Sequence, residues 1–380
     1  MDATEEVTLH APVPAVAKAV KARAARSLCS LCEEPVDYRK KYTQGSLLGT
    51  GASGSVFEVW MGGDISRKFA AKIHKGSLSE AAAKAQVEEI RVLRRLNNCD
   101  HVLRLTDVCA EPAKPEIGKI LVLELGSTPL TDFIKPKYIS TRVPNEDVAK
   151  KFSQQLVCGL AELHRLNIAH RDIKPANVVA VVDQEEGWRM KYCDFGQSTI
   201  ADDNQLLLAN ILRGTFPYFA PEEFFCETFN FKADVWSLAM VLARLWRKGG
   251  QKLVPNGSSD LALVDRIKEY MLNITCILGG FTAKTFCEET RVGMVHYDQY
   301  DAVCSAAPAQ SSLKIQLTQD PHKRPDLNIP QTAVDLLAAM LQYDPVARLS
   351  ADQACQHPYF HEEEAAASAD VDKCLDAPLC

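Results

Sequence analysis

The middle of the chain carries a run of polar residues whose types and spacing suit phosphoryl transfer. Residues 170–177 read His-Arg-Asp-Ile-Lys-Pro-Ala-Asn, and residues 194–196 read Asp-Phe-Gly. Five such polar residues at these positions occur together by chance in about one of ten thousand chains of this length. Phosphoryl transfer needs a carboxylate to orient the attacking hydroxyl, a cation to offset charge on the moving group, and oxygen ligands for magnesium. The candidates for these three roles are, in order, Asp172, then Lys174, then Asn177 with Asp194.

The alternative interpretation of this run is a polar loop at residues 170–172 and an ordinary turn at residues 194–196. A strand is predicted between them, at residues 178–182. Because the two motifs occur together on either side of one predicted strand, the alternative is the less favoured one.

Residues 49–56, which read Gly-Thr-Gly-Ala-Ser-Gly-Ser-Val, are typical of a phosphate-binding loop. Glycines let the backbone approach phosphate oxygens closely and present N–H groups to them. A Rossmann turn shares this spacing but opens a helix, whereas the alternating pattern of residues 56–60 predicts a strand. A Gly/Ser-rich hairpin is the remaining alternative. The candidate nucleotide-binding residues here are Leu48, Gly49, Thr50, Gly51, Ala52, Ser53, Gly54, Ser55 and Val56.

Lys72 lies on a predicted strand at residues 69–73, two residues after Ala70. Residues two apart on a strand share a face, so both side chains can face a nucleotide. Taken alone, a solvated strand lysine would be the better interpretation.

A predicted helix over residues 79–96 offers Lys72 an acidic partner, either Glu88 or Glu89. Glu89 precedes Leu93 and Leu96 by four and seven residues, which places the three on one helical face. We therefore expect Glu89 to face inward and pair with Lys72, and Glu88 to be a surface charge.

The elements that must position these residues change character once along the chain. Residues 42–126 are predicted to form mainly strands, at 56–60, 69–73 and 120–123, with a hairpin turn at 62–64 and the helix at 79–96. Ser77 or Ser79 is the expected N-cap of that helix. From residue 145 onward helical patterns dominate.

Taken in this order, the motifs resemble those of the eukaryotic protein kinase family, serine/threonine type, from about residue 42 to residue 360. The resemblance implies an α+β, two-lobed protein kinase fold. The β-rich N-lobe would span residues 42–126 and the mainly α-helical C-lobe residues 127–360. Residues 1–41 would be a flexible N-terminal extension and residues 361–380 a C-terminal tail.

The resemblance also implies residue roles. Asp172 would be the base or orienting group for the substrate hydroxyl, and Lys174 would reach the γ-phosphate. Residues 214–222 resemble the segment that closes an activation loop, in which Glu222 pairs with Arg348, and Asp234 would cap the backbone of the catalytic loop. Further ATP-binding residues implied are Ala70, Lys72, Glu89, Leu123, Glu124, Leu125 and Val179.

The activity implied is transfer of the γ-phosphoryl group of ATP to serine or threonine hydroxyls of proteins, with Mg2+ as the metal cofactor. Lys174 together with Thr215 is the form seen in serine/threonine kinases. Residues 343–345 and 357–360 are similar to the group that contains cyclin-dependent and MAP kinases. That group usually has arginine immediately before Ala-Pro-Glu, where this chain has Phe219, so the subfamily is left open.

Two rival functions fit the same fold. A pseudokinase would scaffold partners without catalysis, but every polar residue that catalysis requires is present. A small-molecule kinase is disfavoured because the Ala-Pro-Glu segment and Arg348 resemble kinases that act on peptides.

The composition bears on other classes of function. A formal charge of −6 argues against a broad nucleic-acid-binding surface, and no apolar run reaches the ~20 residues that span a bilayer. Thirteen cysteines without regular spacing indicate reduced thiols, hence a cytoplasmic or nuclear protein. Cys29 and Cys32 lack the second pair that a structural zinc site needs. The expected partners are protein substrates, with an activating protein partner left open, and neither nucleic acid nor a membrane.

The expected activation loop departs from the family pattern, because residues 200–214 contain no Ser, Thr or Tyr. Kinases with an arginine at the position of Arg171 are often activated by a phosphate in this loop. We expect instead that the apolar loop packs against the protein itself or is covered by a partner. The alternative is phosphorylation at Ser198, Thr199 or Thr215.

Cys193 precedes Asp194 and is expected to line the back of the nucleotide cleft. A small buried hydrophobe is favoured there over a reactive thiol.

Overall fold

The computed structural model of this 380-residue chain describes its two lobes with several gaps. Residues 9–35 of the expected N-terminal extension, including the Cys29/Cys32 pair, and the tail after residue 361 lie outside the described residues. The residues described are 7–8, 36–51, 54–74, 79–115, 118–134, 146–183, 187–201, 207–208, 211–212, 214–226, 228–247, 250–255, 260–286, 288, 294, 297–305, 311–318 and 329–361.

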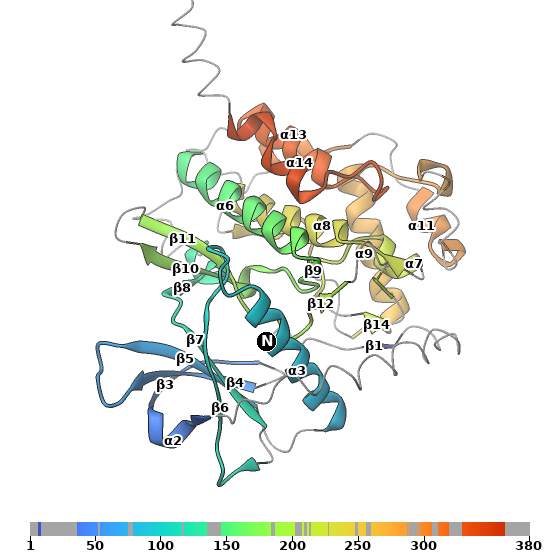
Figure 1. The fold of residues 1–380 in the computed structure, drawn as a ribbon. Coiled ribbons are helices and arrows are strands. Elements are labelled where there is room, and N and C mark those ends of the chain that lie inside the picture. Colours follow the sequence, from blue (N-terminus) through green and yellow to red (C-terminus); the bar gives the residue numbers. More distant parts are fainter. Residues whose placement is uncertain are drawn as a thin grey trace, which may run out of the picture.

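The N-lobe is a six-stranded sheet with one long helix beside it (Figure 1). The strand order is β2-β6-β7-β5-β4-β3, and every neighbouring pair is antiparallel except β2 with β6. Gly62 and Gly63, with φ of 59° and 79°, make the turn between β4 and β5, as predicted. The elements are β2 (Val36–Asp37), α2 (Tyr38–Lys41), β3 (Tyr42–Thr50), β4 (Gly54–Met61), β5 (Lys68–His74), α3 (Glu80–Arg95), β6 (Leu105–Ala110) and β7 (Lys119–Glu124).

Helix α3 begins where its capping chemistry predicts. The Ser79 side chain accepts a hydrogen bond from the backbone N–H of Ala82, at 3.2 Å, and satisfies one of the first free N–H groups of the helix. Its inward face buries Glu89, Ile90, Val92 and Leu93, so the predicted orientation of Glu89 is confirmed.

Among the described residues, the N-lobe sheet includes Val36, six residues before Tyr42. Strand β2 extends the sheet beside β6, and the Tyr38 side chain in α2 is 0% exposed. Tyr38 and Tyr42 share a core cluster with Val59. The sequence does not indicate that Tyr38 is buried, because the charged residues Arg39, Lys40 and Lys41 follow it directly.

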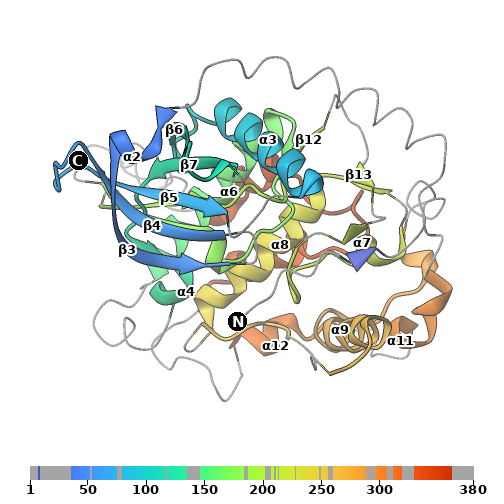
Figure 2. The ribbon, with the colours of Figure 1, turned by 90° about the horizontal axis from the view of Figure 1, so that it is seen from below.

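The C-lobe is built around the buried helix α8, which packs against both α6 and α13, while α14 packs on α6 (Figures 1 and 2). Eleven of the twelve residues of α8 are buried, which explains why its sequence is apolar on all sides. The helices are α4 (Leu130–Phe133), α6 (Glu146–Arg165), η3 (Pro175–Asn177), α7 (Glu222–Phe225), α8 (Lys232–Ala243), η4 (Arg244–Trp246), α9 (Leu263–Leu278), η6 (Ala283–Thr285), η7 (Tyr297–Gln299), α11 (Asp301–Ser305), α12 (Leu313–Thr318), α13 (Gln331–Met340), α14 (Ala351–Cys355) and η8 (Pro358–Phe360).

Two small sheets flank the loops that contain residues 170–177 and 194–196. Strands β11, β10 and β8 form one sheet, and β12 pairs with β9. The predicted strand after residue 177 is confirmed as β10. Their bounds are β8 (Thr128–Pro129), β9 (Ile168–Ala169), β10 (Val178–Asp183), β11 (Gly187–Tyr192) and β12 (Thr199–Ile200).

The apolar activation loop pairs with other parts of the chain at two places. Strand β13 (Leu207–Leu208) pairs with β15 (Thr228–Phe229), and β14 (Ile211–Leu212) pairs with β1 (Val7–Thr8). Both pairings are antiparallel. They agree with the expectation that this loop packs against the protein itself.

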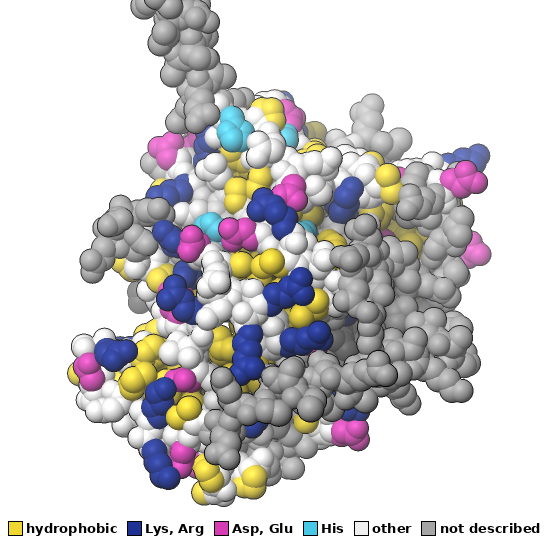
Figure 3. Space-filling model, viewed as in Figure 1, with side chains coloured by type: hydrophobic (Ala, Val, Ile, Leu, Met, Phe, Trp, Pro, Cys, Tyr) yellow, Lys and Arg dark blue, Asp and Glu magenta, His cyan; other side chains and the backbone are white. Residues whose placement is uncertain are grey.

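On the face shown in Figure 3, basic side chains are scattered over both lobes with acidic side chains among them. Among the described residues, no helix has the length and apolar character needed to cross a membrane.

Candidate active site

Lys72 on β5 lies between two carboxylates that come from opposite sides of the site. Its Nζ is 2.6 Å from Oε1 of Glu89 on α3 and 2.7 Å from Oδ1 of Asp194, which follows β11. The predicted ion pair with Glu89 is therefore confirmed. The Asp194 contact ties the N-lobe sheet to a loop of the C-lobe.

The charges of this triad determine its protonation. Burial disfavours the Lys72 ammonium, but Asp194 and Glu89 outweigh that effect and raise the pKa of Lys72. The neighbouring Lys72 charge lowers the pKa of Asp194 to about 2, so Asp194 is ionised at neutral pH. Burial raises the pKa of Glu89, and Lys72 opposes that change.

The catalytic loop holds Asp172 in a network of three neighbours. Lys174 Nζ lies 2.9 Å from Asp172 Oδ2 and donates to Thr215 Oγ1 at 2.8 Å. Thr215 in turn donates to Asp172 Oδ1 at 2.8 Å. Asn177 Nδ2 donates to the backbone oxygen of Asp172 at 2.8 Å and to its Oδ2 at 2.9 Å. Lys174, Asn177 and Thr215 thus converge on the carboxylate of Asp172.

Asp234, at the start of α8, holds the backbone of the same loop. Its Oδ2 accepts from the N–H of His170 and its Oδ1 from the N–H of Arg171, both at 2.8 Å. The predicted capping role is confirmed. Arg171 and Asp194 have φ of 65° and 60°, a left-handed conformation that costs free energy for non-glycine residues and often occurs at functional sites.

The glycine loop joins β3 to β4, and β4 pairs with β5, the strand that carries Lys72. Gly54 is required by a close backbone approach, because a Cβ there would lie 2.5 Å from the carbonyl oxygen of Ile73. A Cβ on Gly49 or Gly51 would meet nothing within 4 Å, so this part of the loop borders open space. Ala52 and Ser53 lie outside the described residues.

The connection between the lobes passes through Glu124 at the end of β7. Its carboxylate accepts from Lys191 Nζ on β11, at 2.8 and 3.1 Å, and from the backbone N–H of Arg104 at 3.2 Å. A Cβ on Gly126 would lie 2.9 Å from a methyl carbon of Val179, so the chain here packs directly on β10. The contact between Glu124 and Lys191 joins residues 67 positions apart, and no local sequence pattern marks it.

Asn177 and Asp194 fit a magnesium ion. The amide nitrogen of Asn177 is used by Asp172, which leaves the amide oxygen as a ligand. Asp194 is ionised, and its side chain is 44% exposed although Lys72 binds one of its oxygens. Magnesium prefers such oxygen ligands and usually completes its coordination with waters and substrate phosphates.

The comparison with known protein families agrees with this geometry. The family described as "Protein kinase domain" matches residues 42–360, most of the chain. The chain belongs to the protein kinase family.

Known kinases similar to this one include both groups expected from the sequence. Mitogen-activated protein kinase 4a of Physcomitrium patens is 27% identical over 317 residues, covering 82% of this chain and 75% of that protein. Mitogen-activated protein kinase HOG1 of Scheffersomyces stipitis is 26% identical, covering 84% of this chain and 74% of that protein. Cyclin-dependent kinase 4 of Xenopus laevis is 26% identical, covering 87% and 94%.

The segment that closes the activation loop of this kinase is tied to the C-lobe by a buried ion pair. Arg348 donates from Nη1 and Nη2 to the two carboxylate oxygens of Glu222, at 2.7 and 2.9 Å, and the side chains are 0% and 1% exposed. Arg348 also donates to three backbone oxygens, those of Lys232, Gln342 and Tyr343. The predicted Glu222–Arg348 pair is confirmed.

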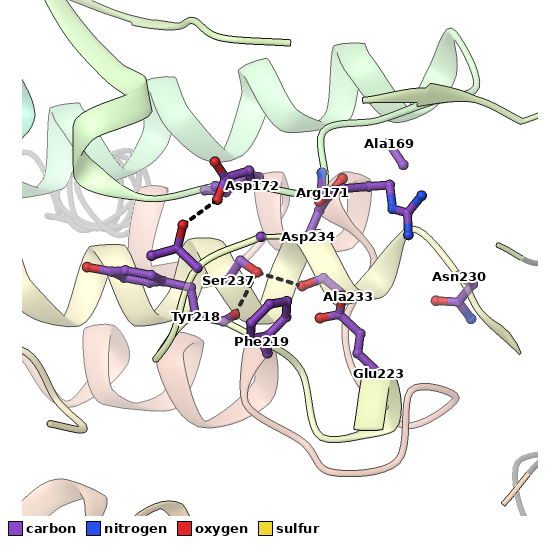
Figure 4. A pocket seen from close by; sticks show the side chains of 13 residues that line it. Ala169, Arg171, Asp172, Tyr218, Phe219, Glu223, Asn230, Ala233, Asp234 and Ser237 are labelled. Atoms are coloured by element: carbon purple, nitrogen blue, oxygen red, sulfur yellow. Dashed lines mark hydrogen bonds between the residues drawn. The ribbon is translucent and has the colours of Figure 1, made fainter. Parts of the chain in front are cut away.

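Beneath this segment of the kinase lies a small pocket between the catalytic loop and α8 (Figure 4). Asp172 and Arg171 line it from the catalytic loop, and Tyr218, Phe219 and Glu223 from the closing segment. Phe219, in place of the arginine usual in the related group, packs edge-on against Phe216 and Phe224.

Cys193 is half-buried rather than fully buried as expected, and burial raises the pKa of its thiol to about 12. At neutral pH the side chain is a neutral thiol and a poor nucleophile.

Proposed function

We propose that this kinase transfers the γ-phosphoryl group of Mg-ATP to serine and threonine hydroxyls of protein substrates. The observation that carries the proposal is the network in which Lys174, Thr215 and Asn177 hold the Asp172 carboxylate. A carboxylate held in this way can orient a substrate hydroxyl and accept its proton as the phosphoryl group arrives.

The remaining residues divide the work of holding ATP. Lys72, fixed by Glu89, would bind the α- and β-phosphates, and the glycine loop at residues 49–56 would cover them with backbone N–H groups. Leu123, Leu125 and the backbone of Glu124 would lie along one side of the adenine.

On the opposite side of the adenine, Val179 would pack from β10, and Ala70 would complete the pocket from β5. Asn177 and Asp194 would hold Mg2+, which when bound neutralises phosphate charge. Lys174 would stabilise the charge on the phosphoryl group as it moves.

The Asp172→Asn variant tests this assignment. Radiolabel transfer from Mg-ATP to casein and myelin basic protein should fall at least about a thousandfold, since Asn cannot accept the substrate proton. ATP should still raise the melting temperature of the variant, because Asp172 is not among the phosphate-binding residues. Asp265→Asn, an exposed carboxylate on α9, is the matched control and should retain full activity.

Label on serine or threonine that disappears in Asp172→Asn supports the proposal. Equal transfer by both proteins would overturn the role of Asp172. If neither protein transfers phosphate although both bind ATP, a missing activating partner or the scaffold function of a pseudokinase becomes the better interpretation.

We also propose that activity does not depend on a phosphate between residues 200 and 214. The support is the absence of a hydroxyl residue there and the strand pairings of β13 and β14. The neighbouring candidates are poorly placed, since Ser198 is buried and donates to the carbonyl oxygen of His170, and Thr215 is buried between Lys174 and Asp172.

Phosphopeptide mapping of the active kinase tests this second proposal. We expect full activity without stoichiometric phosphate at Ser198, Thr199 or Thr215. A stoichiometric phosphate at any of the three, lost together with activity on phosphatase treatment, would contradict it. If no such phosphate is needed, an activating protein partner is the next candidate for the control of activity.

The reduced cysteines favour the cytoplasm or the nucleus as the location of this kinase.

A further inference from the structure

Two cysteines far apart in the sequence meet where α14 packs against α6 (Figure 1). Cys158 lies in the middle of α6, and Cys355 is the last residue of α14. The Cys355 S–H donates to the Cys158 sulfur, and the two Sγ atoms are 2.7 Å apart. The S–S bond of a disulfide is about 2.05 Å long, so a short movement would bring the two sulfur atoms to bonding distance.

An ion pair holds the same two helices together beside the thiols. Arg165, seven residues after Cys158 on α6, contacts Asp352, three residues before Cys355 on α14. Both the Nε and Nη2 atoms of Arg165 lie 2.8 Å from Asp352 Oδ1. The C-terminal end of α14 is held as well, because a ring nitrogen of His361 lies 3.2 Å from the carbonyl oxygen of Cys355. The ion pair and the His361 contact thus help to hold α6 and α14 in the position that places the two thiols side by side.

The two thiols are not equivalent. The hydrogen bond from Cys355, aided by the Arg165 charge, lowers the pKa of Cys158, while the same hydrogen bond and burial raise the pKa of Cys355. Cys158 is therefore the better nucleophile at neutral pH, and Cys355 is placed to react second.

We propose that Cys158 and Cys355 form a reversible disulfide site that is oxidised by a peroxide. The Cys158 thiolate attacks one peroxide oxygen, the O–O bond breaks, and hydroxide leaves to become water with the proton lost from Cys158. The Cys355 sulfur then attacks the resulting sulfenic acid. The S–O bond breaks as the S–S bond forms, and the departing hydroxide takes the Cys355 proton as a second water. The two thiols lose two electrons in total and the peroxide gains them.

The disulfide would join residues 197 positions apart, and so close a loop that includes most of the C-lobe. A cross-link over so long a loop restricts the unfolded chain strongly. Oxidised protein should therefore melt about 5 °C above reduced protein. None of this depends on phosphoryl transfer, so the site can be tested apart from the proposed function.

The sequence suits a direct test by peptide mapping. Trypsin releases Cys158 in the peptide 152–165 and Cys355 in the peptide 349–373, and each peptide contains a single cysteine. The full chain is treated with an equimolar amount of hydrogen peroxide, quenched with catalase, alkylated and digested without reductant. We expect a linked 152–165/349–373 species, two hydrogen masses lighter than the sum of its peptides, which disappears after dithiothreitol.

Two variants sharpen the result. In Cys355→Ser the oxidation of Cys158 should stop at the sulfenic acid, which dimedone traps, and the rise in melting temperature should be absent. Cys276→Ser removes an exposed thiol on α9 and should retain both the linked peptide and the rise.

Recovery of both wild-type peptides only in alkylated form after peroxide treatment would overturn the proposal. Linkage of Cys158 to a cysteine other than Cys355 would overturn it as well. Because the wild-type peptide map decides alone, a Cys355→Ser protein that failed to fold would not obscure the outcome.

Discussion

At the scale of single residues, the site contains one carboxyl group whose environment no motif predicts. Glu223 follows the Ala-Pro-Glu segment and is 5% exposed, with Oε2 accepting from the backbone N–H of Ala220 at 2.8 Å. Burial raises its pKa to about 8, and the nearby Glu222 charge adds to that effect. The folded protein therefore holds Glu223 protonated at pH values where the unfolded chain is ionised.

The pH dependence of stability follows from this shift. Because the pKa of Glu223 is higher in the folded state, its contribution is complete below about pH 4.5 and is lost as the pH rises toward 8. Wild type should lose about 1.4 kcal/mol of unfolding free energy per pH unit in that window relative to Glu223→Gln, which mimics the protonated form. Urea unfolding at several pH values measures the difference, and parallel curves for the two proteins would disprove the assignment.

At the scale of elements, the N-lobe depends on residues that the glycine loop and Lys72 never touch. The short helix α2 inserts Tyr38 into the sheet core, where its ring stacks on Tyr42 with centroids 6.2 Å apart. Arg39 pairs with Glu111 and Lys41 with Asp107, so α2 is tied to β6 and the turn that follows. The helix thereby anchors strand β3, which leads into the glycine loop.

Tyr38→Ala should therefore unfold the kinase more easily, by about 3 kcal/mol, since it removes a fully buried aromatic ring. Tyr38→Phe retains the ring and loses only the 3.3 Å hydrogen bond to Gln44, so it should cost about 1 kcal/mol or less. Thermal and urea unfolding of both variants tests this. Equal stability of Tyr38→Ala and wild type would show that residues 36–41 do not stabilise the N-lobe.

At the scale of the whole molecule, one buried ion pair connects segments 126 residues apart. Arg348 binds both oxygens of Glu222, three backbone carbonyls and the face of Trp236, 5.1 Å from the ring centroid. It joins the end of the activation segment to α8 and to the residues after α13. A planar guanidinium can satisfy all these acceptors at once, whereas an ammonium cannot.

We expect Arg348→Lys to lower the free energy of unfolding by about 3 kcal/mol, because it keeps the charge but leaves buried acceptors unpaired. Arg165→Lys is the matched control. Its ion pair with Asp352 is more than half exposed and should change stability by about 0.5 kcal/mol or less. Similar losses in the two variants would show that the burial of Arg348 does not govern its contribution.

The sequence by itself predicted the arrangement of the candidate catalytic residues and determined the two-lobed order of elements. Asp172, Lys174 and Asn177 lie within six positions, so local backbone geometry brings their side chains together. Helical phase was likewise enough to choose Glu89 over Glu88 as the partner of Lys72. Spacing along one element is a local property, and a sequence states it directly.

Only the tertiary structure decided which distant residues share an environment. Two of these environments are the buried positions of Tyr38 and Glu223. Two others are contacts between elements far apart in the chain, the Glu124–Lys191 pair and the contact of Cys158 with Cys355. Tyr38 is flanked by charges and Glu223 is itself charged, so no apolar period marks either residue as buried. Desolvation and hydrogen bonding depend on what surrounds a side chain in three dimensions, and that surrounding exists only once the lobes have folded.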